Sequence, residues 1–390
     1  MGVTEPARAP RVRQGAVLAG CLLFAGVAAG NGFDRIATWH PARVATVPAL
    51  FAAQSLGPRG DAALAARDPA TATALGERYV AAAPLDPAAT ALLGAGRLVG
   101  GDAAGADAAF RVAGQLGWRV PVTQRYWLAR ALQLGDWRVA AQRLDALLRQ
   151  QPRLVSEAAL IDPFEADPSG RAELLARLAL RPGWLAYYGN DVEGLPSERL
   201  ARRAAVLVDL AGAGVVTGCK VAGAPVARLA ALGAVAEAQR LWRAQCGGGQ
   251  GLVNDPQFAR ASLTEAASPF DWAIGANADL DLSFSSDTGP RLLTVRGPAR
   301  FTQAVASQLL VLAPGRYRLG WRGAADGGIE AAIGCQRDAA TPLAASYAAA
   351  TGRWQAQITL DAACAGHWLV FALRPGVAGA SLGAISLEPL

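Results

Sequence analysis

The sequence predicts a multidomain protein of α and β structure, with a membrane-directed N-terminus, a helical middle and a C-terminal antiparallel β-sandwich. Three observations predict it: a charge-free apolar run near the start, an alanine- and leucine-rich stretch with regular helix signals, and short alternating segments beyond a glycine cluster. We place a basic cytoplasmic tail at 1–14, a transmembrane anchor or signal segment at 15–33, a linker at 34–60, a helical domain at 61–247 and the sandwich at 252–390.

Composition narrows the function classes. The 390 residues exceed one typical domain, and alanine and glycine inflate the apolar fraction of 52%. The net charge of +6 is spread thinly, without a basic block, which argues against nucleic acid as a partner. Only His40 and His367 are present, and no nucleophile-elbow, P-loop, dinucleotide-binding or zinc-protease motif occurs. We therefore expect no catalytic residue, metal or cofactor.

The apolar run from Gly15 to Gly30 follows Arg8, Arg11 and Arg13, an arrangement that directs export. Its 16 residues would span about 24 Å, short of a hydrocarbon core of ~30 Å unless neighbouring residues extend it. We expect a single-pass anchor in a bacterial inner membrane, with residues after about 33 in the periplasm.

Two alternatives remain open for this segment. The small residues Ala28 and Gly30 would suit a signal peptidase, which would give a secreted protein. The sequence Leu18-Ala19-Gly20-Cys21 resembles a bacterial lipobox, which would give a lipid-anchored protein with Cys21 as its new N-terminus. All three outcomes place the remaining chain outside the cytoplasm.

The other four cysteines fall into two local pairs and form no CxxC motif. In an exported protein, such pairs suit disulfides better than zinc or redox chemistry. We predict a bridge between Cys335 and Cys364 and, less directly, between Cys219 and Cys246. Buried free thiols are the alternative.

Asp-Pro pairs punctuate the helical middle at Asp68, Asp86, Asp162 and Asp167. An aspartate accepts hydrogen bonds at the N-cap, and proline suits the first helical turn, so each pair predicts a helix start.

A repeat with a period of 34 residues runs through the same region. Gly101-Asp102 recurs as Gly135-Asp136, with Ala106 and Phe110 matched by Ala140 and Leu144, and Gly233, Ala238 and Trp242 keep the same spacing. This pattern resembles tetratricopeptide repeats, best over residues 69–155. The resemblance implies a helical array that binds a protein partner along one surface. An unrelated helical array and a plain spacer are the alternatives.

Beyond Gly247 the pattern changes to short alternating runs. These predict strands at 279–284, 291–296, 308–312, 316–321, 354–360, 368–373 and 384–387. In one of them, Tyr317, Leu319 and Trp321 share a face opposite Arg316, Arg318 and Arg322. Many short strands in about 140 residues indicate a two-sheet sandwich. We expect it to fold independently from about Leu252.

The pattern Gln308, Leu312, Pro314-Gly315, Tyr317 and Leu319 resembles jelly rolls of the carbohydrate-binding-module kind. Pro269-Phe270-Asp271-Trp272 resembles the entry to such domains in bacterial envelope proteins of exopolysaccharide or O-antigen production. The resemblance implies possible polysaccharide binding without assigning contacts. Our candidates for ligand contact are Trp272, as a stacking aromatic, and Arg316, Arg318 and Arg322, toward an anionic glycan. Core packing for Trp272 and a solvated face for the arginines are the simpler interpretations.

The sequence thus predicts a non-catalytic binding or scaffolding protein of the bacterial envelope, in exopolysaccharide or O-antigen assembly or export. A glycan-active enzyme is one alternative, for which Asp279 and Asp281 are the nearest acid pair. A structural spacer without ligand is the other. A groove lined by acids would favour the enzyme, and a carboxylate-free groove would favour binding.

Overall fold

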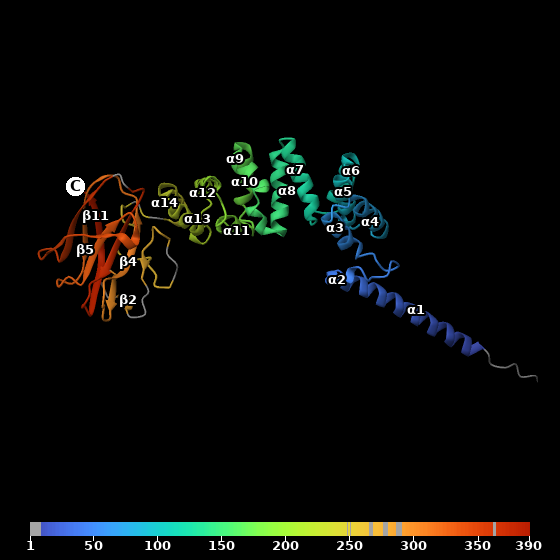
Figure 1. The fold of residues 1–390 in the computed structure, drawn as a ribbon, viewed down its shortest axis with the longest axis horizontal. Coiled ribbons are helices and arrows are strands. Elements are labelled where there is room, and N and C mark those ends of the chain that lie inside the picture. The colour runs from blue at the N-terminus through green and yellow to red at the C-terminus, as the bar shows by residue number, and fades with distance from the viewer. Residues whose placement is uncertain are drawn as a thin grey trace, which may run out of the picture. The chain divides into compact units, whose positions relative to one another are not determined.

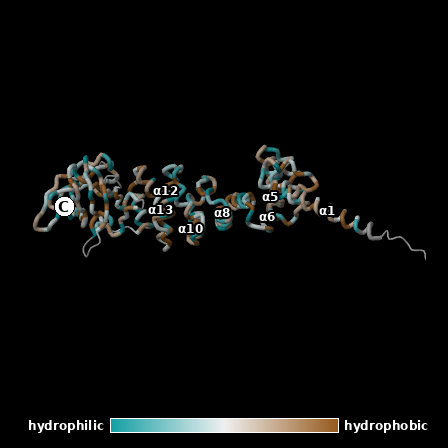
Figure 2. The backbone as a smooth tube through the Cα atoms, turned by 90° about the horizontal axis from the view of Figure 1, so that it is seen from below, coloured by the Kyte–Doolittle hydropathy of each residue, from teal (hydrophilic) through white to brown (hydrophobic). Residues whose placement is uncertain are grey.

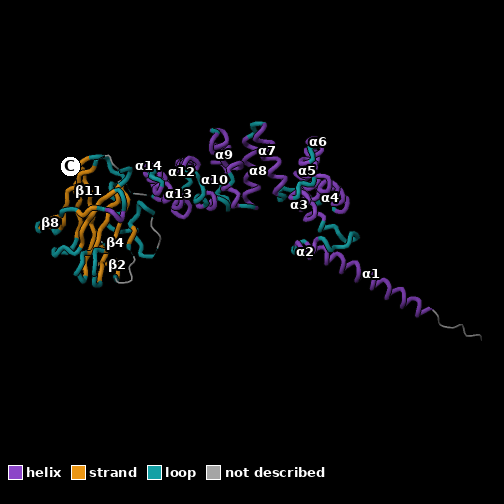
Figure 3. The backbone as a smooth tube through the Cα atoms, in the orientation of Figure 1, coloured by secondary structure: helices purple, strands orange, loops and turns teal. Residues whose placement is uncertain are grey.

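A computed structural model describes residues 9–247, 249, 251–264, 268–275, 280–285, 291–361 and 364–390. Helices occupy the described chain as far as Cys246, and strands follow from Ala273 (Figures 1 and 3). The chain forms two compact units, Met1–Gln150 and Gln151–Leu390. The division falls inside the helical region, so the second unit joins several helices to the sandwich.

The first unit begins with a long apolar helix, α1 (Ala9–Ala37). By length and composition, its stretch from Gln14 to Ala37 could cross a membrane, and the apolar 18-residue window within it is not buried inside the protein. Figure 2 shows hydrophobic residues along this helix. The 24 residues of the stretch rise about 36 Å, whereas the apolar run alone would span about 24 Å. The longer stretch is enough to cross a hydrocarbon core of ~30 Å.

The chain folds back against the C-terminal end of α1. Asp34 is only 2% exposed, and its carboxylate accepts hydrogen bonds from the backbone amides of Ala53 (3.0 Å), Gln54 (2.7 Å) and Ser55 (3.0 Å). The Phe51 ring lies so close to Gly30 that a side chain at Gly30 would clash. The segment 34–60, expected to be a linker, is therefore folded and holds the short helix α2 (Pro41–Val44) and the start of α3.

The rest of the first unit is a series of antiparallel helices. Two of them start at an Asp-Pro pair, as predicted, because Asp68 and Asp86 accept bonds from first-turn amides. Asp102, which was not predicted as a cap, accepts such a bond at the start of the helix after it. The helices are α3 (Leu56–Ala65), α4 (Pro69–Ala82), α5 (Pro87–Val99), α6 (Ala103–Leu116), α7 (Pro121–Gln133) and α8 (Trp137–Gln150).

The predicted period of 34 is visible in the structure, since α5 and α6 have bounds that recur in α7 and α8 with that offset. Gly101, Gly135 and Gly233 all adopt positive φ (87°, 69° and 82°) immediately before a helix. In all three copies, the alanine five residues after this glycine and the bulky residue nine residues after it are buried. These pairs are Ala106 and Phe110, Ala140 and Leu144, and Ala238 and Trp242. The repeated residues thus mark turns and helix contacts.

The second unit opens with helices that surround a buried ion pair. The helices are η1 (Pro152–Ser156), α9 (Ala158–Ala166), α10 (Pro168–Leu178), α11 (Leu185–Asn190), α12 (Ser197–Gly212), α13 (Cys219–Ala231) and α14 (Val235–Cys246). Glu165 on α9 accepts bonds from Arg203 of α12 (3.1 Å) and Tyr188 of α11 (2.7 Å), and both charged side chains are fully buried. Burial and the adjacent Glu165 raise the pKa of the Tyr188 hydroxyl well above its usual value.

One predicted helix start is wrong. Asp167 caps α10 ahead of Pro168, as expected, but Pro163 lies inside α9, which begins at Ala158. The carboxylate of Asp162 instead accepts a bond from Arg199 on α12 (2.6 Å). The Asp162 carboxylate is thus engaged by a neighbouring helix and does not cap a helix start. Helix α9 is short, and it tolerates Pro163, which lacks a backbone N–H, in its second half.

Two antiparallel sheets form the sandwich. One sheet has the order β1-β4-β10-β6-β7 and the other β2-β3-β11-β5-β9-β8. The strands are β1 (Ala273–Ile274), β2 (Asp281–Ser285), β3 (Leu292–Arg296), β4 (Gln303–Leu310), β5 (Gly315–Arg322), β6 (Ile329–Gly334), β7 (Thr341–Pro342), β8 (Ala345–Ala348), β9 (Arg353–Leu360), β10 (His367–Leu373) and β11 (Gly379–Pro389), with a short 3₁₀ turn, η2 (Arg337–Ala339).

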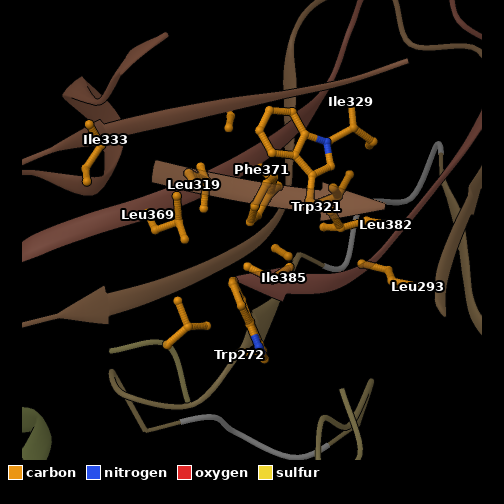
Figure 4. Packing of buried hydrophobic residues seen from close by; sticks show 14 of the residues in the cluster. Trp272, Leu293, Leu319, Trp321, Ile329, Ile333, Leu369, Phe371, Leu382 and Ile385 are labelled. Atoms are coloured by element: carbon orange, nitrogen blue, oxygen red, sulfur yellow. The ribbon is translucent and has the colours of Figure 1, made fainter. Parts of the chain in front are cut away.

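The space between the sheets is filled by large apolar side chains from both of them. Trp321 of β5 stacks toward Trp354 (ring centroids 6.3 Å apart) and meets Phe371 of β10 edge-on (5.7 Å). Figure 4 shows Trp321 and Phe371 among the leucines and isoleucines of this core. The predicted alternation along β5 is confirmed, because Tyr317, Leu319 and Trp321 are buried while the intervening arginines are exposed.

All seven predicted strands have counterparts, although several bounds differ. Strand β4 begins five residues before the predicted start, and β11 is much longer than 384–387. Asp279, the predicted start of another strand, lies outside the described residues. The strands β1, β6, β7 and β8 were not predicted.

Candidate functional site

The outer face of the six-stranded sheet carries the predicted arginines. Along β5, Arg316, Arg318 and Arg322 point away from the core. On the neighbouring strand β9, Gln357 is paired with Arg318 and accepts a bond from Arg316 (3.2 Å). Residues two apart on a strand lie about 7 Å from each other on one face, so these side chains form an extended row.

Arg353 extends this row across a neighbouring strand. It starts from β9, passes over Gly320 of β5 and donates to the carbonyl of Ala384 (2.6 Å) and the Ser386 hydroxyl (2.9 Å) on β11. A side chain at Gly320 would lie 2.8 Å from the Ser386 Oγ and 3.3 Å from the Arg353 guanidinium. The glycine therefore keeps the face flat and lets one guanidinium lie against the sheet.

The arginine face, as we call the outer face of the six-stranded sheet, is electropositive. Strand register places five guanidinium groups and two carboxylates on it: Arg296, Arg316, Arg318, Arg322 and Arg353, with Asp281 and Glu388. In the described part of the chain, no carboxylate lies within ion-pair distance of Arg316, Arg318 or Arg322. Their positive charges are therefore available to an external anion.

Trp272, the predicted stacking aromatic, is a core residue. Its side chain is 2% exposed and packs against Phe258 (ring centroids 5.2 Å apart) and Phe371 (6.0 Å). Its indole N–H donates to the carbonyl of Asp255 (2.9 Å), so the polar atom is satisfied within the protein. Figure 4 shows the ring below Ile385 in the sandwich core. The prediction that Trp272 contacts a ligand is wrong, because both faces of the ring are covered.

The motif residues around Trp272 join the helices to the sandwich. The Trp242 ring on α14 packs on Phe270 (5.6 Å) and donates its N–H to Asp271 (3.2 Å). Burial raises the pKa of the Asp271 carboxyl. Asn254 donates to the same carboxylate (3.1 Å), and its backbone exchanges two hydrogen bonds with Gln308 (2.8 and 2.9 Å). Phe270 and Asp271, which the sequence analysis assigned to a resemblance to carbohydrate-binding modules, therefore form contacts between α14 and the sandwich, and Gln308, from the same resemblance, binds Asn254 beside them.

Both predicted disulfides are present, with Cα separations of 5.0 Å for Cys219–Cys246 and 5.5 Å for Cys335–Cys364. Cys219 and Cys246 join the start of α13 to the end of α14. Cys335 and Cys364 join the turn after β6 to the segment before β10. Cys21 is exposed on α1.

A recess that the sequence did not predict lies between the end of α13 and the outer face of the five-stranded sheet, where β4 ends and β10 begins. Its volume is about 550 Å³, and the Cys335–Cys364 bridge forms part of its wall. Its polar and aromatic lining comes from Gln336, Arg337 and the partly exposed Trp368. Sequence reasoning missed these residues because helix and sheet, far apart along the chain, build the recess together.

Only one member of the acid pair considered for catalysis lies within the described residues. Asp281 lies on the arginine face, opposite Arg296 in the strand register. Asp279 lies outside the described residues. Among the residues described, no group of three histidine, cysteine, aspartate or glutamate side chains comes together in a way that could hold a metal ion.

Comparisons with known proteins add little. No protein-family model matches the chain, and no curated protein matches its sequence. Three solved structures each match about a third of the chain. A carbohydrate-binding module described as "CBM4 structure and function" is 17% identical (TM-score 0.27), over 35% of this chain and 99% of its own. A sugar binding protein from Bacteroides thetaiotaomicron is 11% identical (TM-score 0.25), over 36% and 100%.

The third structure, TmCBM61 in complex with β-1,4-galactotriose, is 11% identical (TM-score 0.24), over 36% of this chain and 100% of its own. These TM-scores are low, so the likenesses carry no argument about this chain. The sandwich architecture rests on its own strand pairing.

Proposed function

We propose that this protein is a non-catalytic binding protein of the bacterial envelope that holds an anionic polysaccharide on its C-terminal sandwich. The observation that carries the proposal is the arginine face, where no carboxylate of the described residues lies within ion-pair distance of Arg316, Arg318 or Arg322. Guanidinium groups bind carboxylates and phosphates in bidentate geometry, and neighbouring glutamine amides suit sugar hydroxyls. An extended, flat row of such groups suits a polymer better than a small molecule.

Two features support an extracytoplasmic setting. The apolar helix α1 could serve as a membrane anchor or a signal segment. The two disulfides fit an oxidising compartment. With the anchor retained, the sandwich would stand in the periplasm and attach polymer to the inner membrane, as a scaffold for polysaccharide assembly or export requires.

The helical repeats supply a place for a protein partner within this proposal. The turns and buried positions recur with the period typical of tetratricopeptide arrays, whose chemistry is recognition. A polymer-binding sandwich and a partner-binding array on one chain would bring an assembly enzyme and its product together.

The test compares polymer binding by the full chain in detergent micelles. In affinity electrophoresis, polygalacturonate, an anionic polymer, cast into the gel should retard the wild-type protein, and neutral dextran cast into the gel should not. Replacing Arg316, Arg318 and Arg322 together by glutamine should weaken binding at least about tenfold, since three desolvated charge contacts are lost. Raising the ionic strength should weaken wild-type binding as well.

The matched control replaces Arg240, Arg243 and Arg300 by glutamine, which removes the same charge from exposed positions away from the sheet face. This variant should bind like wild type. Equal binding by both triple variants would refute the arginine face as the site. Shortening of the polymer, measured as released reducing ends, would establish the enzyme instead, and no binding by wild type would favour the spacer.

A further inference from the structure

We propose that the recess between α13 and the five-stranded sheet is a second binding site, which takes an N-acetylated sugar residue. It lies on the opposite side of the sandwich from the arginine face, because each face is the outer surface of a different sheet. The proposal does not depend on the function proposed above.

The walls of the recess are held at a fixed spacing. Gly366, before β10, lies so close to α14 that a side chain there would come within 2.9 Å of Val235 and 3.2 Å of Leu309. The Cys335–Cys364 bridge fixes the turn that carries Gln336 and Arg337. Trp242 anchors α14 to the sandwich through Phe270 and Asp271. A site formed before ligand arrives avoids much of the ordering cost of binding.

The chemistry of the lining selects the ligand. One wall consists of small apolar groups, supplied by Ala227, Ala230 and Ala231 of α13, and Trp368 adds an aromatic surface. Apolar C–H faces of a sugar ring pack on such aromatic surfaces, and an acetyl methyl fits against alanine side chains.

The polar groups at the recess all favour an acceptor-rich ligand. Gln336 and Arg337 are exposed at the mouth and can donate to an acetamido carbonyl or to ring oxygens. Among the described lining residues, none carries a carboxylate side chain, so they offer no charged partner to a cationic ligand. A volume of about 550 Å³ falls within the usual range for small-molecule sites.

The experiment uses the full chain in detergent micelles with N-acetylglucosamine as the probe and glucose as its unacetylated match. Saturation-transfer NMR should show binding of N-acetylglucosamine with the strongest signal at the acetyl methyl, and markedly weaker binding of glucose. Replacing the exposed Ala231 by phenylalanine fills the recess from the helix and should weaken binding at least about tenfold. Arg337→Ala should weaken it less.

Ala201→Phe is the matched control, since Ala201 is an exposed alanine on α12 away from the recess. It should bind like wild type, and so should the triple arginine-face variant, which separates this site from the proposed polymer site. Equal affinity for glucose and N-acetylglucosamine, or full binding by Ala231→Phe, would overturn the proposal. Preferential binding of octanoate would identify the recess as an acyl-chain site and overturn it too.

Discussion

His367 begins strand β10 with its side chain 3% exposed, one residue before Trp368 of the recess. Burial lowers the pKa of its imidazole, and the nearby Asp361 offsets this only in part. The Nδ1 atom has no hydrogen-bond partner in the described structure. The fold therefore favours the neutral imidazole.

This burial predicts a pH dependence of stability. In the unfolded chain His367 gains a proton as the pH falls through about 6.5, while the folded protein resists protonation until a lower pH. The unfolded state then binds more protons, so the free energy of unfolding should decrease as the pH falls below about 6.5. Thermal unfolding between pH 7.5 and about 5 should show a steeper loss for wild type than for His367→Gln. The exposed His40 provides the control, and an identical slope for His367→Gln and His40→Gln would contradict the prediction.

At single residues, sequence reasoning succeeded where one strand decided the outcome. Alternation along β5 placed Arg316, Arg318 and Arg322 outside and Trp321 inside without any knowledge of the partner strands. The prediction for Trp272 was wrong because this residue precedes a strand of only two residues, which is too short to show an alternation of buried and exposed side chains. Its burial depends on Phe258 and Phe371, which are distant along the chain.

Among the elements, the folded end of α1 has the clearest consequence. Asp34 supplies the acceptor for three successive amides ahead of α3, and Arg59 on α3 donates to the carbonyls of Val44 and Val47. These contacts tie a potential membrane helix to the first helix of the repeat region. Helix α1 therefore continues into the fold of the first unit.

Asp34→Ala should loosen this connection, because it leaves three amides without their charged acceptor. Hydrogen bonds to charged groups contribute about 1.5–3 kcal/mol each at most, and water will replace part of that loss. We expect the amides of Ala53, Gln54 and Ser55 to exchange hydrogen at least about tenfold faster, measured by mass spectrometry on the full chain. Asp326→Ala, at an exposed loop position, should leave their exchange unchanged. Unaltered protection in Asp34→Ala would show that other contacts hold the segment.

Elements were predictable where their signals were local. The helix starts at Asp68, Asp86 and Asp167 followed from capping chemistry, whereas Asp162 was engaged by Arg199 from another helix. Strand β6 escaped prediction because its alanines and glycine carry little β preference. The first half of β4 is similarly rich in small side chains and gains its stability from β10.

For the whole molecule, the contacts between α14 and the sandwich bear on which part of the chain folds as a unit. The sequence favoured a sandwich that folds alone from about residue 252, but Trp242 of α14 covers Phe270 and binds Asp271. The glycines near residue 247 marked a change of secondary structure, and the packing across that point depends on tertiary contacts. The compact unit accordingly starts at Gln151.

Two truncated chains test this junction. A chain of residues 151–390 should unfold in one cooperative transition. A chain of residues 252–390 lacks α14, exposes Phe270 and should melt roughly 5–10 °C lower, as expected for the loss of one or two kcal/mol in a domain of this size. Trp242→Ala in the longer chain should reproduce most of the loss. Equal melting temperatures for the two chains would mean that the sandwich needs no support from the helices.

The two disulfides join cysteines that are consecutive along the chain beyond α1, with separations of 27 and 29 residues. If the chain is exported N-terminus first, as proposed, Cys246 emerges when Cys219 is the one thiol already outside the membrane segment, and Cys364 emerges when Cys335 is the next one unpaired. Short loops also close faster than long ones. The order of emergence therefore selects the native pairing, and maturation of this protein should require a thiol oxidant but no disulfide isomerase.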